Sequence, residues 1–487
     1  MYGARMAGIL PRLIRGLIYT AATAVIVLAL LVGLVRLLLP QVPEYQEEVR
    51  RVAEQATGFD VDFVRLSASW PLRGPELSLY DVRLLDPQTG VELVAAEQIA
   101  VGLSVFRLFG EGALVPSRLA VSGIKLDIER QANNDWRLQG RPLADWLGDG
   151  ETSGAVPEID LLLEDVQLRY NDAAIANSRV DAQLSSLALT LNDDQVSLDG
   201  RVELDGAVPG RVALSALVDG ELLSADRRYD DVEWTVSLDT ESLDLRALLD
   251  LALRSETPLV GAFGDLELNA RMRGFQPTDA VAEFDFEDVV LRTGDAGEAS
   301  YPRLAGAVEW GTTRQGWVLA ARELRVQRPD SMWPRSDLRL AVSRGDDGSQ
   351  SLLVSMSFLR LQDLYPLVEA VATPEARDGV LPAELRGDVR AVDFALTTRP
   401  EQAVRYSLSV EADRLGIVDA PGGITADGLS GNVVADQDGG RLELASADAR
   451  FALPDVFPDP LLAEELSGFL VWRVTEDAVR VLSDSFR

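Results

Sequence analysis

The chain has 487 residues, of which 47% are hydrophobic, so it can bury a large core and is not a disordered segment. It contains no His and no Cys, which removes the commonest general base, the commonest metal ligands and every thiol nucleophile. The formal net charge of −32 argues against nucleic acid as a partner, and it requires that any contact with anionic lipid be hydrophobic.

Residues 17–39 are predicted to be a membrane anchor. The run from Leu17 to Val35 carries no charge and extends roughly 28 Å, about one hydrocarbon core. Arg residues precede this run and Glu residues follow it, so the positive-inside rule places residues 1–16 in the cytoplasm and the remainder across the membrane. A cleaved signal peptide is the alternative, but residues 36–43 offer no cleavage site of small residues. We expect an uncleaved single-pass anchor.

Residues 43–58 are predicted to be a helix that follows the anchor. Pro43 suits a first helical turn, and Gly58 is typical of a helix end. Val49 and Ala53 belong to an apolar stripe at helical spacing. We expect this helix to cap one end of a sheet, and a partner-binding helix is the alternative.

From residue 59 to 487, apolar and polar side chains alternate in many short runs separated by turn residues. A period of two places all the apolar members of a run on one face of a β-sheet. We expect mainly β structure: an elongated, twisted antiparallel sheet, curled into an open groove with a hydrophobic interior, and a few short helices. The residues predicted to line this groove are Val196, Leu198, Val202, Leu204, Val232, Trp234, Val236, Leu238, Leu266, Leu268, Met272, Tyr406, Leu408 and Val410.

Two later segments, Leu243 to Arg254 and Leu359 to Val371, are predicted to be helices with similar leucine patterns. A second similarity relates Leu304 to Trp310, which contains Leu-x-Gly and ends in Trp, to Leu466 to Trp472. Such echoes indicate degenerate repeats of a strand-rich unit, as in quasi-one-dimensional proteins. Chance similarity of common strand patterns is the alternative.

The sequence contains no phosphate-binding glycine loop, no nucleophile elbow and no cluster of metal ligands. Asp436 to Gly439 resembles the start of a calcium loop, but it lacks the remaining ligands and is better explained as a hairpin turn. Two carboxylates could still serve glycoside chemistry. We expect no enzymatic activity, no cofactor and no metal.

So few helices cannot cover the apolar face of so many strands. Either the sheet closes on itself as a sandwich or barrel, or it forms an open trough. A trough of Leu, Val and Ile left to water would be an unusually large apolar patch. Acyl chains would fill it, and each buried methylene contributes about 0.8 kcal/mol.

The chain resembles the AsmA-like family, most closely its YhdP-type members. The similarity rests on the anchor, on Ala56 to Asp62, on Leu66 to Trp70 and on Gly74 to Leu84. It implies an inner-membrane-anchored periplasmic β-groove that moves phospholipid toward the outer membrane, with phospholipids and the inner membrane as partners and no catalytic residues. Those relatives are longer, so we expect the C-terminal part of the groove to be missing.

Two other functions stay open at this point. A structural or scaffolding periplasmic protein could close its sheet over a dry core and support envelope assembly through other envelope proteins. A polysaccharide-binding or polysaccharide-hydrolysing β-protein would carry exposed aromatic residues among its polar positions. Trp234, Trp310 and Trp472 instead lie on apolar runs, which disfavours this last possibility.

Overall fold

The computed structural model describes residues 46–484 except 72–73, 105–115, 134, 143–158, 176–177, 193–194, 207, 220–231, 254–256, 275, 294–296, 364–383, 401, 421–423, 453–458 and 476–477. The predicted anchor at residues 17–39 therefore lies outside the described residues. Among those that are described, no helix is both long enough and apolar enough to cross a membrane. The described part is mainly β structure with few short helices, as expected.

The chain divides into two compact units. Unit 1 comprises residues 1–171 and 181–200, and unit 2 comprises residues 172–180 and 201–487. The elements centred in unit 1 are α2 (Gln46–Thr57), β1 (Asp60–Asp62), β2 (Arg65–Ser69), β3 (Glu76–Leu85), β4 (Glu92–Leu103), β5 (Pro116–Ser122), β6 (Lys125–Arg130), β7 (Trp136–Leu138), β8 (Arg141–Pro142), β9 (Ile159–Asp172) and β10 (Val180–Leu191). Strand β11 (Gln195–Gly206) includes the boundary between the units.

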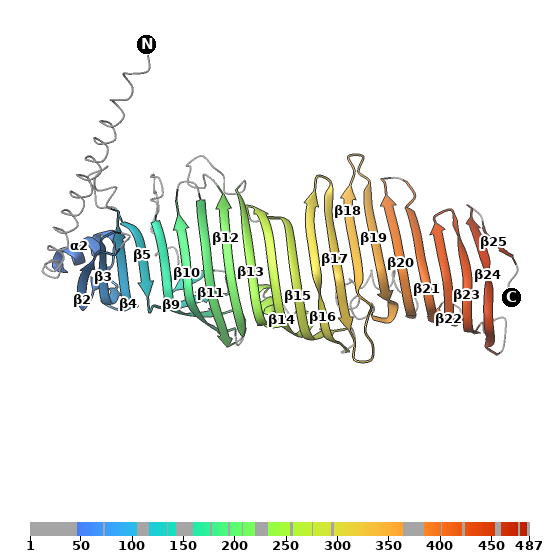
Figure 1. The fold of residues 1–487 in the computed structure, drawn as a ribbon, viewed down its shortest axis with the longest axis horizontal. Coiled ribbons are helices and arrows are strands. Elements are labelled where there is room, and N and C mark those ends of the chain that lie inside the picture. The colour runs from blue at the N-terminus through green and yellow to red at the C-terminus, as the bar shows by residue number, and fades with distance from the viewer. Residues whose placement is uncertain are drawn as a thin grey trace, which may run out of the picture. The chain divides into compact units, whose positions relative to one another are not determined.

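Unit 2 is built almost entirely of strands, with helix α5 among them. Its elements are β12 (Gly210–Asp219), β13 (Glu233–Asp244), α5 (Leu245–Leu253), β14 (Leu259–Arg273), β15 (Gln276–Arg292), β16 (Glu298–Thr313), β17 (Gly316–Gln327), β18 (Ser336–Arg344), β19 (Gln350–Arg360), β20 (Glu384–Thr398), β21 (Arg405–Ala420), β22 (Ile424–Asp436), β23 (Gly439–Ala452), β24 (Leu461–Val474) and β25 (Val479–Asp484). From β12 to β25, every strand pairs antiparallel with the next one in the chain (Figure 1).

Helix α2 lies within the range 43–58 predicted to be helical. It ends where Gly58 adopts a left-handed φ of 74° and donates its backbone N–H to the carbonyl of Glu54. Its Val49 and Ala53 pack against a buried cluster that includes Leu66. The apolar stripe that was visible in the sequence therefore covers the first strands of unit 1.

Unit 1 departs from the all-antiparallel expectation at one place. Strand β5 pairs parallel with β9, with Arg118 opposite Asp160 and Ser122 opposite Glu164. Parallel neighbours need a long connection, and here that connection contains the small strands β6, β7 and β8. Hairpin signals alone could not reveal this pairing, because its partners are more than 40 residues apart.

A recurring β-bulge keeps the apolar side chains of each strand on one face of the sheet. In eight strands one non-glycine residue adopts a left-handed φ, and an apolar residue follows it. These eight residues are Asp81, Asp165, Ser242, Asp288, Glu323, Ala391, Arg414 and Asp448. In β15, for example, Phe286 and Val289 are buried, whereas Glu287 and Asp288 between them are both exposed. The extra outward residue lets the apolar side chains before and after the bulge stay on the same face.

The sheet of unit 2 has its main hydrophobic core at one end of its strands. The buried residues of this core are Ala262, Phe286, Val289, Ala299, Tyr301, Val326, Trp333 and Phe358. Leu245 of α5 packs against them. The predicted helix from Leu243 to Arg254 is thus present as α5, slightly shorter, because Leu243 and Asp244 end β13. The other predicted helix, Leu359 to Val371, is wrong at its start: Leu359 and Arg360 end β19. Residues 361–363 are helical, and residues 364–371 lie outside the described residues.

Candidate functional site: an apolar face on the sheet of unit 2

The register of unit 2 aligns the apolar side chains of successive strands on one side, which we call the apolar face. In β12, β13 and β14, Leu214, Leu238 and Leu268 lie directly opposite one another. Residues opposite each other in an antiparallel pair project to the same side of the sheet. The face therefore begins with three strands whose leucines are cross-strand neighbours.

The same side continues through the middle strands. Leu268 is opposite Ala282 of β15, which is opposite Val308 of β16, which is opposite Ala321 of β17. Further rungs join the next strands in pairs: Leu319 with Leu340, Leu340 with Val354, Val354 with Phe394, and Phe394 with Leu408.

The last strands extend the face to β24. Val410 is opposite Val433, Val433 is opposite Leu442, and Leu442 is opposite Leu470. The apolar face is thus continuous across the thirteen consecutive strands from β12 to β24. Along most of it the side chains are only partly buried.

The structure places ten of the predicted groove residues in or beside β13, β14 and β21. Trp234 lies opposite Met272, and Val232 immediately precedes β13. The predicted residues that share the apolar face by register are Trp234, Val236, Leu238, Leu266, Leu268, Met272, Tyr406, Leu408 and Val410. The other four, Val196, Leu198, Val202 and Leu204, alternate with more polar residues along β11. Sequence reasoning missed the members of this face on β12, β15–β20 and β22–β24. On β15, β16 and β17, small residues such as Ala282, Gly306 and Ala321 stand where larger apolar ones would give a clear signal.

The opposite side of the same strands is charged. Arg271 Nε lies 3.0 Å from Asp279 Oδ1, Arg273 pairs with Glu233, and Arg303 pairs with Asp285. The hydrogen bond from Arg303 lowers the pKa of Asp285 below its usual value. These pairs are exposed, so they stabilise the fold little and mainly keep this side soluble. The two sides of the sheet therefore differ sharply in polarity.

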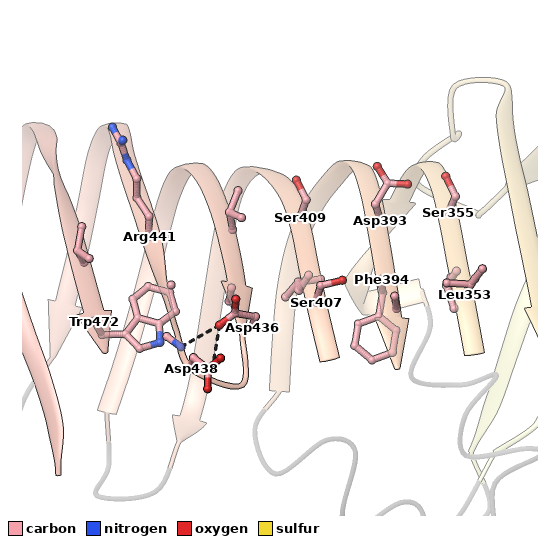
Figure 2. Close-up of a pocket in the computed structure, with 18 of the residues that line it drawn as sticks. Leu353, Ser355, Asp393, Phe394, Ser407, Ser409, Asp436, Asp438, Arg441 and Trp472 are labelled. Atoms are coloured by element: carbon pink, nitrogen blue, oxygen red, sulfur yellow. Dashed lines mark hydrogen bonds between the residues drawn. The ribbon is translucent and has the colours of Figure 1, made fainter. Parts of the chain in front are cut away.

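A hollow of 1030 Å³ lies over strands β18 to β24 (Figure 2). Most of the residues around it belong to the polar side, among them Ser355, Asp393, Ser407 and Ser409. Of the predicted groove residues, only Leu408 borders it. Asp436 accepts hydrogen bonds from the backbone N–H groups of the turn residues Asp438 and Gly439. The segment that resembled a calcium loop is therefore a hairpin turn.

At its buried end, the apolar face is held by a polar contact. The Asp363 carboxylate, 6% exposed, lies 3.2 Å from Arg328 Nε and accepts a 2.7 Å hydrogen bond from Trp333 Nε1. The Tyr301 hydroxyl donates to the Asp363 backbone carbonyl, and burial raises the pKa of Tyr301. This contact ties the chain after β19 to β16 and β17. The polar groups of this contact bind one another, so the contact has a structural role and is not a reactive site.

The described residues contain no group of three acidic, His or Cys side chains that could hold a metal ion. What they do contain is an open sheet with one long apolar face and one charged face. This combination defines a class of proteins whose sheet presents a long hydrophobic surface, which over the described residues is only partly buried.

The chain belongs to the YhdP protein family, whose sequence profile matches residues 5–487. It is 25% identical over 488 residues to the intermembrane phospholipid transporter YhdP of Escherichia coli (strain K12), an alignment that covers 94% of this chain. The chain spans 36% of the length of that curated relative. No solved structure matches the chain.

Proposed function

We propose that this protein conducts the acyl chains of phospholipids along the apolar face of unit 2. The observation that carries the proposal is the continuity of that face from β12 to β24. Each methylene that leaves water on such a surface contributes about 0.8 kcal/mol, so lipid tails are favourable occupants. The similarity to a phospholipid transporter supports the same substrate class.

The proposal includes a curled sheet and a place in the cell envelope. A sheet that curls around its apolar face would form a groove with a hydrophobic interior, and strand twist and the recurring bulges favour such curling. Residues 17–39 would anchor the chain in the inner membrane, with the bulk of the protein in the periplasm and lipid moving toward the outer membrane. The charge asymmetry around Leu17 to Val35 supports this topology.

Photo-crosslinking at neighbouring positions of β14 tests the conduit directly. A photoreactive amino acid at Leu268 should capture phospholipid, because Leu268 lies between Leu238 and Ala282 on the apolar face. The same amino acid at Glu267 should not, because one step along a strand turns the side chain to the other side. Trp234 with Glu233 provides a second pair one step apart, and Leu408 with Arg405, three steps apart and so also on opposite sides, provides a third. Equal capture at both members of each pair, or capture at neither in the folded protein, would refute the conduit.

A charge on the apolar face tests transport. Leu268→Arg should abolish lipid transfer, because an unpaired guanidinium among acyl chains costs several kcal/mol (about 2–7 by analogy with unpaired polar groups). Glu267→Arg is the matched control and should retain folding and transfer. If the sheet instead closed over its own dry core, as a scaffolding protein would require, Leu268→Arg would unfold the protein. Circular dichroism of both variants separates these cases.

A further inference from the structure

The apolar face has two unlike ends, and this difference bears on how a lipid would lie on it. At one end of the strands the side chains are almost completely buried. The buried residues at this end, one from each of several strands, are Leu243, Ala262, Val289, Tyr301, Val326, Phe358, Val389, Ala412, Ala426 and Ala449. We call this end the buried seam.

Large amphipathic aromatic residues lie at the other end, which we call the aromatic rim. It comprises Trp234, Trp310, Trp317, Tyr406 and Trp472. Strand direction places them together: β13 runs from Trp234 to Leu243, and β16 runs from Tyr301 to Trp310. Tyr406 is 37% exposed, and the four tryptophans are partly exposed. The face therefore grades from partly exposed aromatic rings to a sealed core.

From these observations we propose that phospholipids bind across the strands, with their headgroups along the aromatic rim and their chain ends toward the buried seam. This inference rests on the proposed function and assigns an orientation to its substrate. Indole and phenol rings favour the boundary between apolar groups and water, because each ring joins an apolar body to a polar N–H or O–H. Trp234 illustrates this, since its Nε1–H donates a 2.6 Å hydrogen bond to the carbonyl of Gly274 in the adjacent turn.

The buried seam is unsuited to a headgroup. A phosphate placed there would lose its water, and burying a charge without partners is prohibitively unfavourable. The charged groups Arg328 and Asp363 beside the seam already form an ion pair with each other. At the rim, in contrast, the turn between β16 and β17 carries the exposed Arg314 close to Trp310 and Trp317 in sequence.

The face between its two ends is long enough to hold one lipid tail. Nine residues separate Trp234 from the seam residue Leu243, which at about 3.3 Å per residue is roughly 30 Å. One leaflet contributes about 15 Å to a hydrocarbon core of about 30 Å. A tail that starts at the rim can therefore lie along a strand and point toward the seam without leaving the apolar face.

Two photoactivatable phosphatidylethanolamines test this orientation on the whole chain. One carries a diazirine on its headgroup, and the other carries it at the end of an acyl chain. Crosslinked peptides are located by mass spectrometry. On β16 we expect the headgroup probe to label residues around Trp310 several-fold more than those around Tyr301, and the chain-end probe to show the reverse preference. Trp310→Leu should weaken the headgroup preference, and Glu309→Gln, on the charged side of the same strand, should leave it unchanged.

Other results distinguish the orientation from the proposed function itself. If each probe labels both ends of β16 equally, or if the headgroup probe favours Tyr301, the orientation is wrong while lipid binding on the apolar face stands. If neither probe labels the apolar face of the folded protein, both the orientation and the proposed function are wrong.

Discussion

Removing the Asp363 carboxylate should destabilise unit 2 far more than its single negative charge would suggest. Asp363→Ala leaves the guanidinium of Arg328, 18% exposed, and the indole N–H of Trp333 without their shared acceptor. Breaking a buried ion pair in this way typically costs about 3–5 kcal/mol. Because Arg328 also donates to the carbonyl of Ser300, we expect the lower end of that range, about 3 kcal/mol.

Two further variants make the experiment decisive. Asp363→Asn keeps an oxygen acceptor but loses the charge, so it should cost less, about 1.5 kcal/mol. Glu241→Ala removes an ion pair with Arg211 in which both side chains are more than 60% exposed, and it should cost about 0–1 kcal/mol. The assay is urea unfolding of the whole chain, followed by circular dichroism. If Asp363→Ala costs no more than Glu241→Ala, the contact does not fasten this end of the sheet.

Three more predictions follow from the packing and the charges of unit 2. Phe358→Ala should lower the free energy of unfolding by about 3–5 kcal/mol in the same assay, because Phe358 is 4% exposed and its ring centre is 5.6 Å from that of Trp333. The control Leu353→Ala, on the same strand but 53% exposed, should lower it by under about 1 kcal/mol. Gly387→Ala should lower the melting temperature clearly more than Gly90→Ala, because a Cβ at Gly387, with φ of 109°, would lie 2.5 Å from the Arg414 carbonyl, whereas one at Gly90 meets nothing within 4 Å. The Arg303–Asp285 pair should stabilise the fold slightly at neutral pH and lose that effect in acid, because the pKa of Asp285 is lowered from 3.8. The difference in unfolding free energy between the unchanged protein and Arg303→Gln should therefore shrink as the pH falls through the lowered pKa. A difference that stays constant from pH 7 to pH 2 would contradict this.

Local signals in the sequence were sufficient for the type of structure and for much of the apolar face. Helix α2 could be predicted because each of its signals is local: the early Glu residues mark its first turn, and Gly58 marks its end. The apolar residues of β13 and β14 could be assigned to one side because the period of two is a property of the backbone itself. The likeness of Leu304 to Trp310 and Leu466 to Trp472 also has a structural counterpart: both Trp residues lie at the aromatic rim, on β16 and β24.

Strand periodicity could not predict how far the apolar side extends. In β16 the face is made by Leu304, Gly306 and Val308, and a glycine carries no hydrophobic signal of its own. In β23 the bulge at Asp448 interrupts the alternation, so a strict period of two would assign Ala449 to the wrong side. A dipeptide of two outward residues before an apolar one, as in Glu287 and Asp288 before Val289, was the signal that could have revealed it.

By itself, the sequence determined that this protein is made of strands with one apolar side, because side-chain alternation is set by neighbours along the chain. Only the tertiary structure decided that β5 pairs with β9 in parallel, that Asp363 meets Arg328 and Trp333, and that one end of the apolar face is sealed while the other is lined with tryptophan. These features depend on contacts between residues tens of positions apart. Such contacts form only when the register of every intervening strand is set, and no local pattern specifies that register.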